Sequence, residues 1–142
     1  MCIIIVKINV KLLYMEYIIT HYDNGQIKER YHILNGKKYG IYIKNDKNGK
    51  LYEQYTYVDD KRIGVGRSYY DIGPLESMCN YVNDKRNGKF IRYYATGEVA
   101  EEQYFIDGNE IGERTMYYPN GKILSNTKHL HHWRFKMEQK LL

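Results

Sequence analysis

The chain has 142 residues and a mass of 17.1 kDa, which is ordinarily enough for one domain. Its formal net charge is +5 and its pI about 9.0, which favours solubility and a mild attraction to polyanions but does not single out nucleic acid, acidic protein or anionic lipid as a partner. The two cysteines, Cys2 and Cys79, are too few for a disulfide scaffold, so we expect a reducing compartment such as the cytoplasm.

The N-terminal run of residues 1–13 is apolar but is interrupted by Lys7, Asn9 and Lys11. It has neither the basic start nor the small-residue cleavage site of a signal peptide, and it is far shorter than the ~20 apolar residues of a spanning helix. Its Ile and Val content suits a β-strand. We therefore expect residues 1–14 to form a capping strand, with no signal peptide and no transmembrane segment.

The remainder of the chain is organised by a 24-residue repeat of glycines. The first set is Gly25, Gly49, Gly73, Gly97 and Gly121. The second set follows fifteen residues behind and is Gly40, Gly64, Gly88 and Gly112. Nine of the twelve glycines therefore belong to one register, which predicts an array of one repeated unit. Glycine at these places allows positive φ in turns and in strand kinks that curve a sheet.

Each unit predicts two strands. After the first glycine, residues of the same kind return at every second position from unit to unit, and Ile27, Glu29 and Tyr31 are the first such set. A period of two is typical of a strand with two different faces. Turn residues such as Asn35-Gly36 follow, and a second run then ends on paired aromatic residues. These pairs are Tyr69-Tyr70, Tyr93-Tyr94 and Tyr117-Tyr118.

Turns at the ends of the units join them into a sheet. The Asn-Gly pairs Asn24-Gly25, Asn48-Gly49 and Asn120-Gly121 predict type I′ hairpin turns. Hairpins joined by hairpins make an all-β fold, an elongated single-layer antiparallel β-meander in which a unit advances about 10 Å. Equivalent side chains should then stand in rows. We expect one ladder of Tyr69, Tyr93 and Tyr117, and another of Tyr70, Tyr94 and Tyr118.

The repeat pattern fades after Ser125. Four apolar residues there follow a helical spacing: Leu130, Trp133, Met137 and Leu141. A helix of this kind could cover the open edge of the sheet. Trp133, Phe135 and Met137 also alternate as a strand would, so a strand stays open as an alternative. The predicted division is a capping strand at 1–14, the repeat array at 15–126 and a C-terminal cap at 127–142, for which we favour a short helix.

The phrase Tyr117-Tyr118-Pro119-Asn120-Gly121-Lys122-Ile123, the Asn-Gly-Lys run that begins at Asn35, and the unit length resemble the MORN repeat family. The resemblance covers roughly residues 15–126. It is closest to the variant form seen in bacterial proteins labelled antitoxins and in proteins of large DNA viruses. Only Gly64-Val65-Gly66 has the paired glycines of the better-known form, and no repeat contains Trp. The resemblance implies an elongated scaffold or binding surface without catalysis.

A row of cations is the most suggestive set of side chains. It comprises Lys37, Lys38, Lys61, Arg62, Lys85 and Arg86, which occupy one place in three successive units. A rim of this kind, which we call the basic rim, could follow a phosphate backbone or an anionic membrane surface. The alternative is that these residues are the solvated charges of ordinary turns, partly neutralised by Asp59, Asp60 and Asp84.

Other chemistry has weaker signals. His129, His131 and His132 could hold a metal, but no carboxylate or cysteine lies at a useful spacing, so we expect no metal. Glu29, Glu53 and Glu101 recur at one position, where pairing with neighbouring Lys or Arg is the expected use. The chain shows no nucleophile motif and no nucleotide-binding loop.

The sequence therefore predicts a non-enzymatic repeat scaffold without a cofactor. Its partner should be another protein, or a second copy, bound through an extended aromatic and polar β-surface. The alternative is a peripheral binder of anionic lipid or nucleic acid that uses the basic rim. A small-molecule substrate is not expected.

Overall fold

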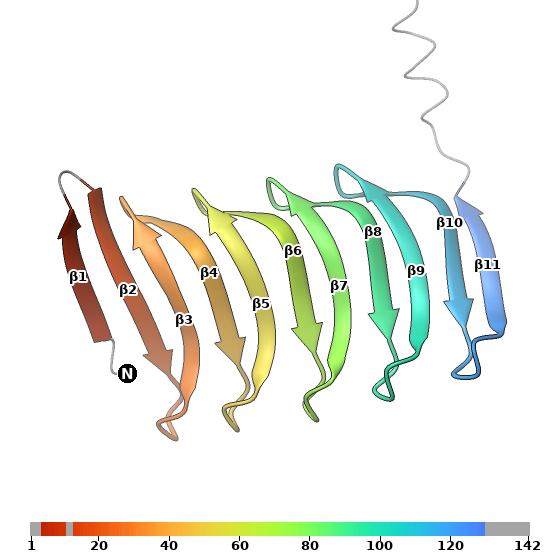
Figure 1. The fold of residues 1–142 in the computed structure, drawn as a ribbon, viewed down its shortest axis with the longest axis horizontal. Helices are drawn as coiled ribbons and strands as arrows, with labels where there is room; N and C mark the ends of the chain where they lie inside the picture. Colours follow the sequence, from red (N-terminus) through yellow and green to blue (C-terminus); the bar gives the residue numbers. More distant parts are fainter. Residues whose placement is uncertain (1–3, 11–12, 130–142) are drawn as a thin grey trace, which may run out of the picture.

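The computed structural model describes residues 4–10 and 13–129. Its eleven strands form one sheet in which they follow each other in sequence order, and every neighbouring pair is antiparallel (Figure 1). The strands are β1 Ile4–Val10, β2 Leu13–His21, β3 Ile27–Leu34, β4 Lys37–Asn45, β5 Leu51–Val58, β6 Lys61–Tyr69, β7 Leu75–Val82, β8 Lys85–Tyr93, β9 Val99–Ile106, β10 Asn109–Tyr117 and β11 Ile123–His129.

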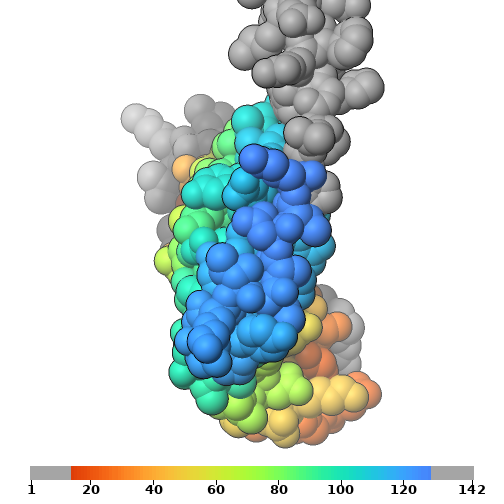
Figure 2. Space-filling view, turned by 90° about the vertical axis from the view of Figure 1, so that its right-hand side faces the viewer, coloured from red at the N-terminus to blue at the C-terminus, as the bar shows by residue number. Residues whose placement is uncertain are grey.

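The sheet is a single layer, as predicted. The described elements are all strands of this one sheet, so neither of its faces is covered by a described helix or by a second sheet. Seen from the β11 end, the strands lie behind one another in a narrow column (Figure 2). The prediction of an elongated antiparallel β-meander of 24-residue hairpins is confirmed.

Two-residue turns lie along one rim of the sheet, the short-turn rim. They link β3 to β4, β5 to β6, β7 to β8 and β9 to β10. In the second of them Asp59 and Asp60 both have positive φ, 51° and 66°, which is the backbone of a type I′ turn. Each of these turns also bonds to the start of an earlier strand, two strands before it: for example, Asp84 N–H donates to the carbonyl of Arg62 in β6 at 3.1 Å.

Longer loops lie along the opposite rim, the long-loop rim, and here the predicted type I′ turns are wrong. In the loop after β2, Gly25 N–H donates to the Tyr22 carbonyl and Tyr22 N–H donates to the Gln26 carbonyl, both at 2.9 Å. Gly25 has φ of 84°, whereas Asn24 is not in the positive region. This is the three-residue connection in which an ordinary turn is followed by a left-handed glycine. The other four long loops repeat it.

The second set of glycines lies inside strands, at bulges. Between β5 and β6, Thr56 pairs with Ile63 and Gln54 with Arg67, so three residues of β6 stand against the single residue between the pairs on β5. The extra residues bend the strand and increase its twist. Gly64 adopts φ of 66° at this bulge, and the equivalent glycines Gly40, Gly88 and Gly112 are also positive. The predicted role of these glycines in strand kinks is confirmed.

The ends of the array differ in part from the expectation. The expected capping strand contains β1, but β2 already begins at Leu13. At the other end β11 continues to His129, so a helix beginning at 127 is wrong for its first three residues, which extend the hairpin with β10. Residues 130–142, where the rest of the predicted helix falls, lie outside the described residues.

Candidate functional site

One face of the sheet, which we call the aromatic face, is built from rings that contact one another at tilted or edge-on angles. Its most buried apolar side chains include Tyr42, Cys79, Tyr81 and Phe105, each 8% exposed or less. Rings contact one another along the sheet: the centroids of Tyr42 on β4 and Tyr55 on β5 are 6.4 Å apart, and those of Tyr55 on β5 and Tyr81 on β7 are 5.7 Å apart, across Gly66 of β6. Contacts of this kind stabilise a sheet by roughly 0.2–1 kcal/mol per pair.

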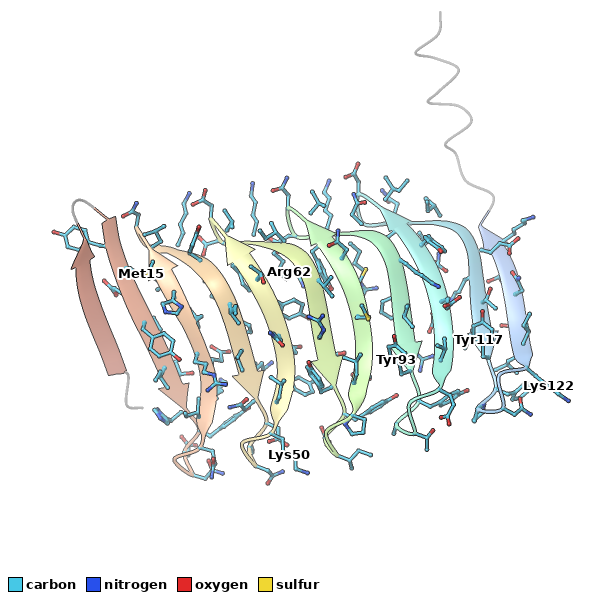
Figure 3. The ribbon with its side chains drawn as sticks, viewed as in Figure 1. Met15, Lys50, Arg62, Tyr93, Tyr117 and Lys122 are labelled. Carbon is cyan, nitrogen blue, oxygen red and sulfur yellow. The ribbon has the colours of Figure 1, made fainter. Side chains whose placement is uncertain are left out.

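Three cations of the basic rim lie over these rings. The Lys38 ammonium is 4.8 Å from the centroid of Tyr31 and 4.9 Å from that of Tyr42. The Arg62 guanidinium is 4.5 Å from the Tyr81 centroid, and Arg62 points onto the sheet near the short-turn rim (Figure 3). In the next unit Arg86 covers Phe90 and Phe105, at 5.0 and 5.2 Å. These cations cover the aromatic face and are attracted to the negatively charged faces of its rings.

The basic rim is therefore two rows and not one. Adjacent residues of a strand point to opposite faces, so the first cation of each pair lies on the face opposite to the second. The first residues are Lys37, Lys61 and Lys85, and all three are exposed. We call them the outer lysine row. They remain available to an anionic surface, whereas Lys38, Arg62 and Arg86 are engaged with the rings.

Carboxylates of the short turns oppose this charge. Asp60 Oδ1 accepts a hydrogen bond from Lys38 N–H at 2.7 Å, and Asp84 Oδ1 accepts one from Arg62 N–H at 3.0 Å. The Arg62 Nε atom also lies 2.9 Å from Asp84 Oδ1. The backbone bond from Arg62, assisted by its side chain, holds the pKa of Asp84 below its ordinary value. The rim consequently carries fixed negative charge between its cations.

The recurring glutamates have the predicted kind of partner in two units. Glu53 pairs with Lys44 at 3.7 Å. Glu101 is 6% exposed and lies between Arg92 and Arg114, at 2.9 and 2.7 Å. In the first unit, Glu29 instead accepts a hydrogen bond from the Tyr42 hydroxyl at 3.1 Å. This row is a structural ladder across the aromatic face.

The aromatic face is thinner where β6 meets β7. Small side chains occupy it there: Gly66 pairs with Cys79, and Ser68 with Ser77. They leave a hollow of about 240 Å³, in which the two serine hydroxyls lie 2.7 Å apart. Burial raises the pKa of the Cys79 thiol, which makes the nucleophilic thiolate scarcer. The arrangement is that of a packed cysteine and not of an activated one.

The predicted tyrosine ladders are not ring stacks. Among the described residues no ring contact joins Tyr69, Tyr93 and Tyr117, which stand on strands two apart, about 10 Å along the sheet. The two rows are joined by hydrogen bonds. The Tyr70 hydroxyl donates to the Tyr93 carbonyl at 2.7 Å, and the Tyr94 hydroxyl to the Tyr117 carbonyl at 2.6 Å. Tyr93 and Tyr117 lie in the long-loop half of the sheet (Figure 3).

The opposite face carries a surface that the sequence reasoning missed. Four apolar side chains of β4 and β6 are exposed there: Tyr39 at 41%, Ile41 at 54%, Ile63 at 36% and Val65 at 37%. Thr56 on β5 pairs with Ile41 on one side and with Ile63 on the other, so the group is continuous. We call it the apolar patch. The alternation of these residues with Lys38, Gly40, Arg62 and Gly64 was the signal that could have revealed it.

Metal and membrane signals are absent from the described part of the chain. Among residues 4–10 and 13–129, no three His, Cys, Asp or Glu side chains come together as a metal site would require. Two of the three clustered histidines, His131 and His132, lie outside those ranges. Within the same ranges, no helix has the length and apolar character needed to cross a bilayer.

The fold, the glycine bulges and the stacked rows define a class, the open-sheet β-repeat proteins built from hairpins. Three segments match the family described as MORN repeat variant, namely residues 38–59, 86–107 and 110–127. The predicted resemblance to the MORN repeat family is confirmed in these three segments. Repeats of this family generally mediate protein or membrane interactions.

Comparisons with whole proteins add little. No curated protein matches the chain. Solved structures with some similarity include a mutant of S. aureus TarM in complex with Fondaparinux, alpha-GlcNAc-glycerol and UDP (11% identity, TM-score 0.43, 75% of this chain), TarM (13%, 0.32, 86%) and the GtfA/B complex bound to UDP and GlcNAc (12%, 0.30, 95%). The chain spans only 21%, 21% and 28% of their lengths, so these similarities say nothing of what it binds.

Proposed function

We propose that the chain is a non-enzymatic repeat scaffold that binds a protein partner through the apolar patch. The observation that supports this choice is the contrast between the two faces. The aromatic face is occupied by its own rings and cations, whereas Ile41 and its neighbours in the patch lie open to solvent. Exposed apolar patches on monomeric proteins commonly mark interaction sites.

The surroundings of the patch fit a protein interface. Further along the same face, between β8 and β11, two charged pairs lie beside the exposed Tyr104: Lys89 with Glu102, and Glu113 with Lys128. An apolar centre beside a polar margin is the usual composition of such interfaces. A partner with an exposed apolar strand or helix face would complement it. The predicted cytoplasmic location stays a prediction.

The test uses a photo-cross-linking residue at Ile41, in a full-length chain mixed with extract of its native host. The expected result is one cross-linked protein, lost when Val65 is replaced by Lys, because a charge there must be desolvated on binding. A cross-linker at Glu98, an exposed loop residue, is the matched control and should not capture it. Identical capture at Ile41 and Glu98, or capture unaffected by Val65→Lys, would rule out the patch.

A second candidate function rests on the outer lysine row. Lys37, Lys61 and Lys85 are exposed and lie in successive units, about 10 Å apart. We propose, as the alternative, that this row attaches the scaffold peripherally to an anionic lipid or nucleic acid surface. Each such charge contributes about 1 kcal/mol near an anionic membrane and is screened by salt.

Matched triple variants separate this function from a structural role. Changing Lys37, Lys61 and Lys85 to Ser should abolish binding to phosphatidylserine vesicles, or to a single-stranded oligonucleotide, and leave the thermal unfolding midpoint unchanged. Changing Lys38, Arg62 and Arg86 to Ser should lower that midpoint, because these cations cover the rings. Binding that survives loss of the outer row would exclude this candidate.

A further inference from the structure

The last strand, β11, leaves one edge of the sheet open. Among the described residues it pairs with β10 alone, and with the loop before it β11 forms the outermost layer in Figure 2. An open edge presents unpaired N–H and C=O groups that invite another strand. Natural edges are usually protected by charged residues or proline. In β11 the one Lys, Arg, Asp or Glu residue is Lys128, and its ammonium already lies 3.2 Å from Glu113.

The units inside the array show what the next strand would supply. The hydroxyls of Tyr22, Tyr70 and Tyr94 each reach across one strand and donate to the last residue of the strand beyond, at 2.9, 2.7 and 2.6 Å. Tyr118 occupies the same place after β10. It is 48% exposed, and no residue in the described ranges accepts its hydroxyl proton. A strand added beside β11 and ending at the long-loop rim would provide the missing carbonyl.

The number of strands decides which partner keeps the sheet antiparallel. Eleven alternating strands leave β1 and β11 running in the same direction. Head-to-tail stacking of copies would therefore pair β11 with β1 in parallel, against the pattern of the whole sheet. Two β11 strands related by a two-fold axis perpendicular to the sheet are antiparallel and keep both aromatic faces on one side. The end of the second β11 then lies at the long-loop rim, beside Tyr118.

We propose that β11 is a self-association edge, through which two copies of the chain pair β11 with β11 and form one continuous antiparallel sheet. Such an isologous contact gives a closed dimer. The interface uses neither the apolar patch nor the outer lysine row. Its test is consequently independent of the two candidate functions above.

The first experiment places like charges at the edge of the full-length chain. Ser125→Lys with Thr127→Lys should raise the dimer dissociation constant at least about tenfold, because lysines of the two copies then face one another. Ile72→Lys with Ala95→Lys is the control, since both residues are exposed in loops and the charge change is equal. Sedimentation across a concentration range reports the constants. A wild-type chain that stays monomeric, or that grows into longer chains, would overturn the proposal, as would an equal effect of both variants.

A second experiment does not depend on charge. In a Cys2→Ser chain, single cysteines are introduced as Ser125→Cys, Asn126→Cys and Thr127→Cys and mildly oxidised. A residue beside the two-fold axis meets its own copy, so at least one variant should form a covalent dimer, and Ala95→Cys should not. Absence of a dimer at all three edge positions contradicts the pairing.

Tyr118 gives a third, conservative test. Tyr118→Phe removes two hydrogen bonds from the symmetric dimer, one for each copy, so it should weaken the dimer by roughly five- to a hundredfold and leave the unfolding of the monomer unchanged. Tyr94→Phe should do the reverse, because its acceptor lies within the same chain. Equal behaviour of the two variants in dimerisation would count against the proposal.

Discussion

At the scale of the residue, two glycines two positions apart serve different purposes. Gly66 is not in the positive-φ region, but a Cβ there would lie 2.6 Å from the Tyr55 ring and 2.8 Å from Tyr81. Gly64 has φ of 66° and open space around it. Gly66 is therefore required by packing, and Gly64 by its backbone conformation.

Substitutions distinguish the two requirements. Gly66→Ala should lower the free energy of unfolding by about 1–3 kcal/mol through overpacking, and Gly66→Asn by at least as much. Gly64→Ala should cost about 1–2 kcal/mol, and Gly64→Asn less, because Asn tolerates left-handed backbone. Urea denaturation measures all four. If Gly66→Asn were more stable than Gly66→Ala, as expected for the same pair of substitutions at Gly64, packing would not be the reason for a glycine at position 66.

Buried and half-buried phenols make stability sensitive to alkali. Burial, the largest cause, raises the pKa of Tyr55 to about 12, and the pKa values of Tyr31, Tyr42 and Tyr57 are raised for the same main reason. In the unfolded chain these phenols titrate near pH 10. Their contribution to stability is therefore complete below about pH 10 and is lost as the pH rises through about 12.

The corresponding experiment compares urea denaturation near pH 9 and near pH 11. The free energy of unfolding should be lower at the higher pH, and the double variant Tyr42→Phe with Tyr55→Phe should show a smaller loss. Stability that does not change over this range, or an equal loss in the double variant, would mean that these phenols are not buried as described.

At the scale of the element, the short turns combine strained backbone with side-chain hydrogen bonds. Asp60 has φ of 66°, and its carboxylate accepts the Lys38 N–H of the preceding unit. An L-residue other than Gly, Asn or Asp loses roughly 1–2 kcal/mol in this conformation. The aspartate at this place therefore tolerates the turn and connects it to its neighbour.

A substitution series at Asp60 separates the two roles. Asp60→Asn should be nearly neutral, since the amide oxygen still accepts the bond. Asp60→Gly loses that bond but relieves the backbone, so it should stay within about 1 kcal/mol of wild type. Asp60→Ala loses both and should cost about 2 kcal/mol. Thermal unfolding gives the order of stability of the three variants. Equal stability of Asp60→Ala and Asp60→Asn would refute the two roles assigned to Asp60.

The strands were predictable from the sequence, but the two kinds of turn were not. Alternation with a period of two and the glycine spacing are local signals, so they place strands such as Ile27–Leu34 well. An Asn-Gly pair fits either a type I′ turn or an ordinary turn followed by a left-handed glycine. The choice depends on where the flanking strands stop pairing, which the pair Asn24-Gly25 by itself does not reveal.

The candidate site was predicted only as a row of charges. Spacing correctly found cations such as Lys61 and Arg62 in equivalent places. Two adjacent strand residues point to opposite faces, however, so the pair cannot act as one rim. Which of the two covers the rings depends on the pairing register, here Tyr57 with Arg62. The apolar patch escaped notice for the same reason, because Ile63 belongs to the other face.

At the scale of the whole molecule, the protein is a one-dimensional array. Each described strand pairs only with its sequence neighbours, and the buried cluster among the described residues is small, Cys79, Tyr81 and Phe105 with Tyr55 and Phe90 against it. Stability of such arrays is approximately a sum of unit and nearest-neighbour terms. The open edges therefore matter more than a central core, which is consistent with self-association through β11.

Deleting one unit tests this account most directly. Removal of residues 61–84 joins Asp60 to Lys85 and leaves the short turn in place, in a chain that carries Ser125→Lys and Thr127→Lys to keep it monomeric. We predict a folded β-protein whose maximum dimension in small-angle X-ray scattering is about 10 Å shorter than that of the same chain without the deletion. A deletion variant that is unfolded, or that keeps its original length, would contradict the array.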